Sequence, residues 1–355
     1  MRKRMLSLAL AAIMTLGLTG CGEIPPAADP APPQASSSAP AESAPAASSA
    51  PAEQEAFTPG AFSIAALKGP TAMGLAKLMD TVDKGGETAN RYTFTLAGAA
   101  DEVTPKLIKG ELDMACVPAN LAATLYQKTE GAIQVLAVNT LGVIYIVENG
   151  DTIQSMADLK GKTIVAHGKG STPEFGLRYL LKENGIDPDA DLTIEWKSEH
   201  SECVAALAAG AATIALLPQP FVTVAQSKLP DLRIALDLTA EWDALDNGST
   251  MITGVIVGRR DTVSENPEAV AAFLREYHES VEWVNANVAE AAAIIGGYGI
   301  VDAAVAEKAL PYCNIVCLVG KQMQDKLGGY LDALYAQEPG SVGGAVPAED
   351  FYFVD

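Results

Sequence analysis

The chain has 355 residues, 49% of them apolar and 19% charged, with 44 acidic residues against 24 basic ones. This length is enough for about two domains of roughly 100–200 residues each. The formal charge of −20 argues against a phosphate-neutralising surface, so nucleic-acid binding is excluded as a main role. With three His, no HExxH motif and no paired CxxC motifs, the sequence also excludes a conventional zinc site.

Residues 1–20 are predicted to be an export signal. Basic residues at positions 2–4 precede an apolar run, Met5–Leu18, that is shorter than the roughly 20 residues a membrane-spanning helix needs. The run leads into Leu18-Thr19-Gly20-Cys21, which resembles the bacterial lipobox; a signal peptide with an incidental cysteine is the alternative. We therefore expect a mature protein that starts at Cys21 and is anchored by lipid to the extracytoplasmic face of a bacterial cell membrane.

Residues 21–57 are predicted to be a disordered tether. Ala, Pro and Ser occupy 25 of the 28 positions in residues 25–52. Such a segment cannot bury a core, and its prolines favour extended, hydrated chain. We therefore expect the folded part to begin at about residue 58.

The rest of the chain alternates strands with helices. Each predicted strand is followed by a loop and a helix, which indicates an α/β fold with mainly parallel sheets. A long helix is expected over Pro267–Asn285, whose apolar residues recur at helical spacing. Strands are expected at 62–67, 92–96, 112–117, 163–167, 192–196 and 213–217, with a long apolar stretch over 135–147.

Loops at the carboxyl ends of strands are natural ligand sites, because the first N–H groups of the next helix lack partners and carry partial positive charge. Two such loops, Lys68–Thr71 and Gly168–Glu174, combine a lysine, glycine and a hydroxyl. In the second, Ser171 and Glu174 fit a capping box, and Asp101 is expected to cap another helix. Each loop could be a helix start only, and together they make ligand binding an equal alternative.

Four segments carry a resemblance to a known family: Leu107–Pro118, Met156–Val165, Gly170–Glu174 and Leu216–Phe221. In this order they resemble the substrate-binding lipoproteins of bacterial ABC importers. More narrowly, they are similar to the nitrate, sulfonate, taurine and thiamine-precursor (NMT1/SsuA-like) group. The resemblance covers about residues 60–350, and the lipobox and tether accord with receptors that Gram-positive bacteria retain by lipid.

The resemblance implies a bilobal type II periplasmic-binding-protein fold, with two α/β lobes joined by two crossing strands around a ligand cleft. Lobe 1 would comprise residues 58–140 and 246–355, and lobe 2 residues 141–245. The implied function is capture of a small polar or anionic solute and its delivery to an ABC permease with its ATPase subunits. The resemblance implies no catalysis and no cofactor, and the protein is expected to be a monomer.

The resemblance also places the ligand at the strand-end loops, with Thr71, Ser171 and Thr172 as preferred hydrogen bonders. Lys68 and Lys169 could equally decorate the rim. The expected residues of lobe 1 are Lys68, Gly69, Pro70, Thr71, Ala72, Gly98, Ala99, Pro118, Ala119 and Asn120, and those of lobe 2 are Gly168, Lys169, Gly170, Ser171, Thr172, Pro218 and Gln219. These loops hold no evident aromatic clamp, which speaks against a stacked heterocycle; the aromatic candidates are Trp196, Tyr145, Trp242 and His200.

An enzyme or a sensor module on the same bilobal fold is the alternative function. An enzyme would need an acid or base in the cleft, for which Asp101, Glu102 and Glu174 are candidates. Cys116 and Cys203 are expected to be buried, and Cys313 and Cys317 leave a metal or redox pair open. His167, His200 and His278 are far apart in the sequence and are expected to form no common site.

Overall fold

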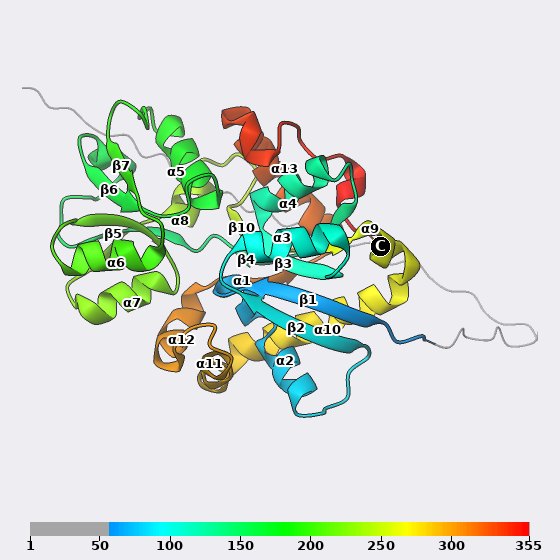
Figure 1. Ribbon diagram of the computed structural model, residues 1–355. Coiled ribbons are helices and arrows are strands. Elements are labelled where there is room, and N and C mark those ends of the chain that lie inside the picture. The colour runs from blue at the N-terminus through cyan, green and yellow to red at the C-terminus, as the bar shows by residue number, and fades with distance from the viewer. Residues whose placement is uncertain (1–56, 355) are drawn as a thin grey trace, which may run out of the picture. The chain divides into compact units, whose positions relative to one another are not determined.

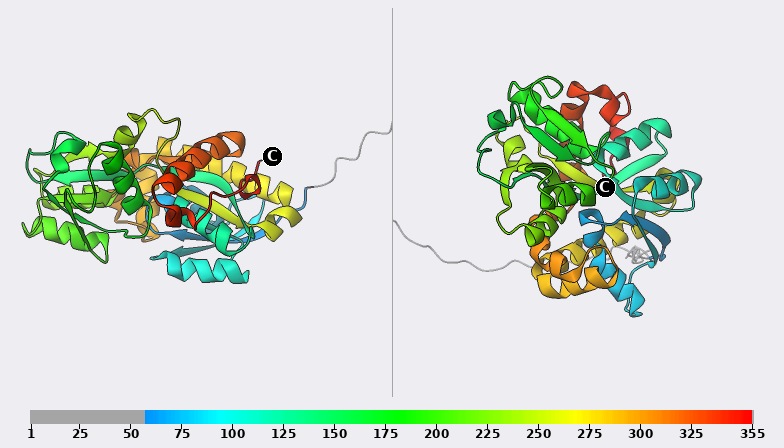
Figure 2. Two further views of the ribbon diagram at one scale, coloured as in Figure 1. Left: turned by 90° about the horizontal axis from the view of Figure 1, so that it is seen from above. Right: turned by 60° about the vertical axis from the view of Figure 1, so that its left-hand side comes forward.

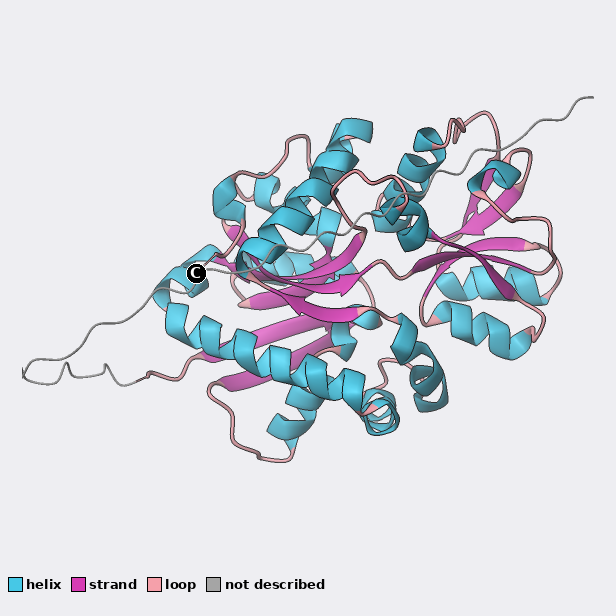
Figure 3. Cartoon of the chain, turned by 180° about the vertical axis from the view of Figure 1, so that it is seen from behind, coloured by secondary structure: helices cyan, strands magenta, loops and turns pink. Residues whose placement is uncertain are grey.

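Two β-sheets flanked by helices form the framework of residues 57–354, the part that this computed structural model describes (Figure 3). The predicted signal, Cys21 and all but the last residue of the predicted tether lie outside these residues. The described residues belong to one compact unit. None of the helices in residues 57–354 has the length and apolar character needed to cross a membrane.

The first sheet has six strands. In order across the sheet they are β11 (Ile315–Leu318), β4 (Ile133–Leu141), β10 (Ile252–Arg259), β3 (Met114–Pro118), β1 (Ala61–Leu67) and β2 (Arg91–Ala97). β1 runs parallel to both β2 and β3, whereas β10 is antiparallel to both of its neighbours.

The second sheet has five strands. In order they are β7 (Thr193–Trp196), β6 (Thr163–Ala166), β8 (Ile214–Pro218), β5 (Ile144–Glu148) and β9 (Arg233–Asp237). β6 is parallel to β7 and β8, whereas β5 is antiparallel to β8 and β9. The six predicted strands correspond to β1, β2, β3, β6, β7 and β8, with ends that differ by at most two residues.

The α/β class is confirmed, but the prediction of mainly parallel sheets is wrong. β5 and β10 follow the two places where the chain changes sheet, and each runs antiparallel to both of its neighbours. The predicted apolar stretch over 135–147 therefore contains two strands of different sheets, β4 and β5. Gly142 and Val143 separate them, and a Cβ on Gly142 would lie 1.9 Å from Oγ1 of Thr239, so a larger residue would force Thr239 to move. The lobe boundaries at residues 140 and 246 stay a prediction.

Helices cover both faces of the first sheet, as Figure 1 shows. On one face they bury the apolar cluster that includes Ile64 and Met114, and on the other the cluster that includes Ala65 and Val117. The first group comprises α1 (Pro70–Met73), α2 (Ala76–Asp83), α10 (Pro267–Ala286), α11 (Val288–Gly297) and α12 (Ala303–Ala309). The second comprises α3 (Ala100–Lys109), α4 (Ala119–Lys128) and α13 (Gly320–Gln337).

The second sheet is covered in the same way. The side with Ile146 and Ile164 packs on α5 (Thr172–Glu183) and α8 (Leu238–Asp243), and this cluster is continuous with that around α4 and α13. The opposite side packs on α6 (His200–Ala208) and α7 (Phe221–Lys228). The remaining helices are α9 (Arg260–Glu265) and four 3-10 turns, η1 (Met156–Leu159), η2 (Leu310–Tyr312), η3 (Pro339–Val342) and η4 (Glu349–Phe351).

An aromatic column lies where α13, the orange-red helix in Figure 2, contacts both β4 of the first sheet and α5, which covers the second sheet. The ring of Tyr179 on α5 packs against Trp242 of α8 in a tilted arrangement with ring centroids 4.3 Å apart, and the centroid of Trp242 lies 5.2 Å from that of Tyr330 on α13. Trp242 and Tyr330 are fully buried. These three rings belong to one hydrophobic core that continues from the first sheet to the second.

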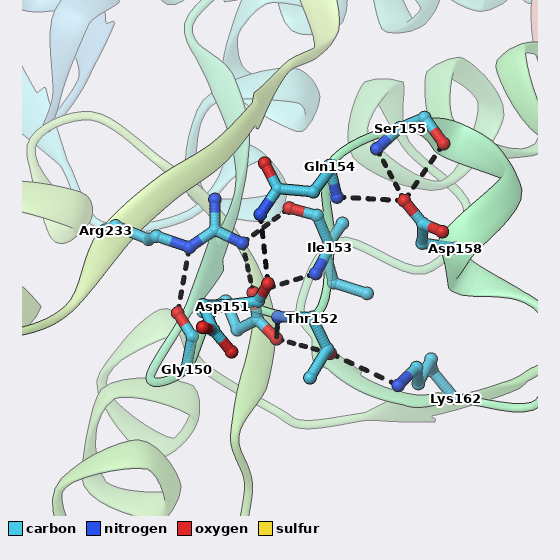
Figure 4. A network of polar contacts seen from close by, with 10 residues as sticks. Gly150, Asp151, Thr152, Ile153, Gln154, Ser155, Asp158, Lys162 and Arg233 are labelled. Carbon is cyan, nitrogen blue, oxygen red and sulfur yellow. Dashed lines mark hydrogen bonds and ion pairs between the residues drawn. The ribbon is translucent and has the colours of Figure 1, made fainter.

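A polar network closes the far end of β5 (Figure 4). Glu148 is only 2% exposed, and its carboxylate accepts hydrogen bonds from Oγ1 and N–H of Thr152, N–H of Ile153 and the guanidinium of Arg233. Burial alone would raise the pKa of Glu148, but these hydrogen bonds lower the pKa below its ordinary value. The buried charge is thus satisfied by the loop that follows β5 and by Arg233 of β9.

Candidate functional site

The carboxyl ends of parallel neighbouring strands gather the candidate loops at one edge of each sheet. In the first sheet β2, β1 and β3 lead into α3, α1 and α4, and in the second β7, β6 and β8 lead into α6, α5 and α7. Neighbouring parallel strands end at the same edge, so each trio of loops is contiguous.

The predicted residues of the first sheet's edge differ in exposure. Gly69, Ala72, Ala119 and Asn120 are buried, Pro70, Thr71 and Pro118 are half-buried, and Lys68, Gly98 and Ala99 are exposed. At the second sheet's edge Thr172 and Gln219 are buried, Gly168, Ser171 and Pro218 are half-buried, and Lys169 and Gly170 are exposed. The two lysines therefore lie at the surface together with Gly98, Ala99 and Gly170, and the other loop residues are half-buried or buried.

One contact brings the two edges together. Oγ1 of Thr172, at the start of α5, donates a hydrogen bond to Oδ1 of Asn120, at the start of α4, over 3.1 Å. Nδ2 of Asn120 donates to the carbonyl oxygen of Ser341 over 3.4 Å. The N-termini of α4 and α5 therefore face each other across the junction of the sheets.

The three preferred hydroxyls already donate within the protein. Oγ1 of Thr71 donates to the carbonyl oxygen of Leu67 over 2.9 Å, and Oγ of Ser171 to that of Gly168 over 2.7 Å. Thr172 donates to Asn120 as described. In this conformation each hydroxyl offers a ligand lone pairs rather than a hydrogen, so the donors left for an anion are backbone N–H groups and the exposed ammonium groups of Lys68 and Lys169.

Three of the neighbouring helices bind their own glutamate at the N-terminus. Glu102 accepts from the N–H groups of Gly98 and Ala99, both over 3.0 Å, where α3 begins. Glu174 accepts from N–H of Gly170 over 2.7 Å before α5, and Glu202 from N–H of Ser198 over 2.9 Å before α6. α4 has no acidic residue in its first turn. A bound anion would meet a carboxylate at α3, α5 and α6, but not at α4, nor at the short helix α1 or at α7.

These contacts correct two capping predictions. Asp101 is not an N-cap, because α3 begins at Ala100 and Ala99 holds the N-cap position. Ser171 is the N-cap of α5, as expected, but its hydroxyl turns back to Gly168 and Glu174 bonds to Gly170. The reciprocal capping box is therefore absent.

A groove of about 530 Å³ lies between α5 and the end of α13. Lys169 and Lys182 line it from the second sheet's side, and Gln337 and Glu338 from the first sheet's side. Arg178 also lines it, but its guanidinium is held by Glu174 and Asp189, with N–O distances of 3.1 and 2.6 Å. Lys169 therefore lies at the mouth of a groove rather than among the buried loops.

The structure brings together two histidines that sequence spacing separated. His167 follows β6 and His200 opens α6, and their ring centroids lie 4.3 Å apart. Phe221, which opens α7, lies 4.7 Å from His200. Distance in the sequence thus did not predict this contact, which arises because β7, β6 and β8 are neighbours; that the histidines form no common site stays a prediction. His278 lies elsewhere, on α10.

The other aromatic candidates and the cysteines are buried or half-buried in the protein. Trp242 and Tyr145 are buried in the core, and Trp196 is half-buried against it. Cys116, Cys203 and Cys313 are buried, Cys317 is half-buried, and all four are free thiols. Burial raises the pKa of Cys313 and of Cys317 to about 12, so both remain protonated thiols at neutral pH. Within residues 57–354 no cluster of three or more His, Cys, Asp or Glu is placed to hold a metal ion.

Known proteins resemble the chain in sequence and in fold. The family described as "ABC transporter, phosphonate, periplasmic substrate-binding protein" matches residues 76–309, more than half of the chain. A protein of Brucella abortus (strain 2308), named a binding protein, is 27% identical over 180 residues, which are 51% of this chain and 54% of that one. The chain therefore spans about half the length of the curated relatives it matches.

Solved structures show the same fold. An ABC transporter protein of Parabacteroides distasonis has a TM-score of 0.69 at 22% identity, over 82% of this chain and 98% of that one. The periplasmic aliphatic sulphonate binding protein SsuA of Escherichia coli has a TM-score of 0.65 at 19% identity, over 83% and 96%. The alkanesulfonate-binding protein of Xanthomonas axonopodis pv. citri has a TM-score of 0.62 at 18% identity, over 82% and 96%. The expected bilobal type II periplasmic-binding-protein fold is thus confirmed.

Proposed function

Because the chain belongs to the family of periplasmic substrate-binding proteins of phosphonate ABC transporters, we propose that it captures a small polar or anionic solute between its two lobes. It then delivers the solute to an ABC permease with its ATPase subunits. The observation that carries this proposal is the meeting of the α4 and α5 N-termini through Asn120 and Thr172. In an α/β fold of this kind, ligands bind at such strand-end junctions.

The proposed solute carries an oxyanion head, such as a sulfonate or a phosphonate. The family is described by phosphonate and two of the structural relatives are named for sulfonates. The head would lie at the start of α4, where no acidic side chain competes for the backbone N–H groups. Since the protein is acidic overall, this local field rather than net charge would hold the anion.

We propose that the solute contacts the two sets of strand-end loops given above, and that Lys68 and Lys169 act at their rim. The lobes would comprise residues 58–140 with 246–355, and residues 141–245. The hydrogen bond between Thr172 and Asn120 would belong to the closed form, which the solute stabilises by touching both lobes.

The proposed location is the extracytoplasmic face of the membrane, with a lipid on Cys21 and the protein as a monomer. Catalysis is not part of the proposal, since Glu102 and Glu174 already accept hydrogen bonds from loop N–H groups. A general acid or base needs a carboxyl that can reach a substrate proton.

A thermal-shift screen of the purified chain tests the proposal. We expect methanesulfonate, methylphosphonate or nitrate at millimolar concentration to raise the melting temperature, because a ligand stabilises the state that it binds. Asn120→Ala should abolish the shift. Asn184→Ala is the control, since Nδ2 of Asn184 donates to Leu180 at the other end of α5. The proposal fails if no polar or anionic solute stabilises the protein and turnover of a substrate is measured instead.

A further inference from the structure

Three aromatic rings line the carboxyl edge of the second sheet, one from each of three neighbouring loops. His167, His200 and Phe221 follow β6, β7 and β8, and successive ring centroids in the order His167, His200, Phe221 lie 4.3 and 4.7 Å apart. We call these residues the aromatic row. His200 is the shared neighbour of the other two rings, so the three side chains form one continuous cluster.

The row is placed to meet a solute. All three residues are half-buried, so part of each remains at the surface. His167 directly precedes Gly168 in the β6–α5 loop, and Phe221 directly follows the β8 loop that contains Gln219. α7, which Phe221 opens, contacts α12 of the first sheet's side (Figure 1). The row therefore lies on the same edge as the polar loops and near the junction of the sheets.

The hydrogen-bonding capacity of the row is not used up by the protein. Nδ1 of His167 lies 3.2 Å from the carbonyl oxygen of Lys197, and since a carbonyl only accepts, Nδ1 carries the hydrogen. In the neutral ring the lone pair is then on Nε2, which bonds to none of the described residues. Nδ1 of His200 is buried and has no partner in residues 57–354.

His200 stays an uncharged aromatic ring at neutral pH. Burial and then the nearby His167 lower the pKa of His200 to about 3. The His167 ring meets the His200 ring edge-on at 71°, and the His200 and Phe221 rings are tilted by 35°. The neutral imidazole and the phenyl ring offer weakly polar aromatic surface that does not attract an anion by charge. This surface suits a planar group of a solute better than its charged head.

We propose that the aromatic row is a subsite for a planar aromatic group of the solute, whose oxyanion head lies at the start of α4. The inference rests on the proposed function and narrows the solute to aryl sulfonates, aryl phosphonates or similar compounds. A ring substituent with N–H or O–H can donate to Nε2 of His167. This revises the sequence-based interpretation that the site lacks an aromatic clamp, because no single loop carries one.

The test compares solutes that share a head and differ in the attached group. The probes are methanesulfonate, cyclohexanesulfonate and benzenesulfonate, with methylphosphonate, cyclohexylphosphonate and phenylphosphonate as the second series. Isothermal titration calorimetry on the full chain gives each Kd. We expect the phenyl compound to bind about 2- to 10-fold more tightly than its cyclohexyl counterpart, as for other aromatic pairs.

Substitutions in the aromatic row test whether its side chains cause the difference in affinity between phenyl and cyclohexyl solutes. His200→Ala and Phe221→Leu should bring the phenyl-to-cyclohexyl ratio to about one and leave methyl-solute affinity unchanged. Phe221→Leu keeps an apolar side chain of similar size, so it guards against loss of folding. His278→Ala is the matched control, because His278 lies exposed on α10, and it should keep the ratio.

The outcomes separate the inference from the proposed function. If all three groups bind equally well on either head, or if the variants keep the ratio, the aromatic subsite is wrong while oxyanion binding stands. If none of the six probes binds, the oxyanion function is contradicted and the subsite with it.

Discussion

Oγ1 of Thr172 donates a hydrogen bond to Oδ1 of Asn120 over 3.1 Å, and the two residues open helices that flank different sheets. Thr172 is 1% exposed and Asn120 is 4% exposed. A buried polar contact of this kind is expensive to break on one side only. Loss of this hydrogen bond at the strand-end loops should therefore lower the free energy of unfolding of the whole folded unit.

Thr172→Val keeps the shape of the side chain and removes the hydroxyl. We expect the free energy of unfolding to fall by about 1–3 kcal/mol, because Oδ1 of Asn120 would stay buried without this donor. Denaturant titration measures the change. Thr124→Val is the control, since Oγ1 of Thr124 only bonds back to the Asn120 carbonyl within α4, 3.0 Å away. Equal effects of the two substitutions would contradict a special role for Thr172.

Glu148→Gln tests the network of Figure 4. The substitution removes the charge that the Arg233 guanidinium and the loop N–H groups bind, so we expect a loss of about 2–4 kcal/mol at pH 7. The folded-state pKa of Glu148 is lowered, so its contribution is present above the unfolded pKa and is lost as pH falls through the folded pKa. The difference between wild type and variant should therefore shrink in acid. A constant difference down to pH 3 would show that the charge is not the cause.

His200→Phe tests the titration of the aromatic row. The pKa of His200 falls from 6.5 to about 3 on folding, so the unfolded chain takes up the proton first as pH falls below about 6.5. Wild type should then lose up to about 2 kcal/mol between pH 7.5 and pH 5 that the variant does not lose. Thermal unfolding at the two pH values measures this. Parallel pH profiles for the two proteins would contradict the lowered pKa.

Gly254→Ala tests the packing between β10 and the first edge. A Cβ there would lie 2.5 Å from Oδ1 of Asn139 and 2.6 Å from Cγ2 of Thr71. We expect a loss of about 1–3 kcal/mol, because both neighbours must move. Gly297→Ala, at the end of α11, meets nothing within 4 Å and should be neutral or slightly stabilising. Chemical denaturation of both variants measures the free energy of unfolding. A Gly254→Ala protein as stable as wild type would contradict the close contact.

The strands were predictable because each is a short apolar run followed by turn residues, as in β1 and β3. The direction of β5 and β10 was not, since antiparallel pairing there depends on which sheet the chain enters after Gly142 and before Ile252. Alternation of strand and helix carries no information about that change of sheet.

The candidate site was predictable loop by loop but not as a whole. Strand-end loops with small residues pointed to Thr172 and Asn120 separately, and their mutual contact follows only from how the sheets meet. The pairing of His167 with His200 depends on the order β7, β6, β8 across the sheet. Residues 33 positions apart can be assigned to one site only when that order is known.

The aromatic column gives this protein a natural optical probe. The chain has three tryptophans. One of them, Trp242, packs between Tyr179 on α5, which covers the second sheet, and Tyr330 on α13, which covers the first sheet. Its indole N–H donates to Ser249 over 2.8 Å, in the segment that returns the chain to the first sheet. On the proposed division into lobes, rotation of one lobe against the other would change the surroundings of this indole. With the other two tryptophans replaced, its emission would then follow such a movement without a label attached to the protein.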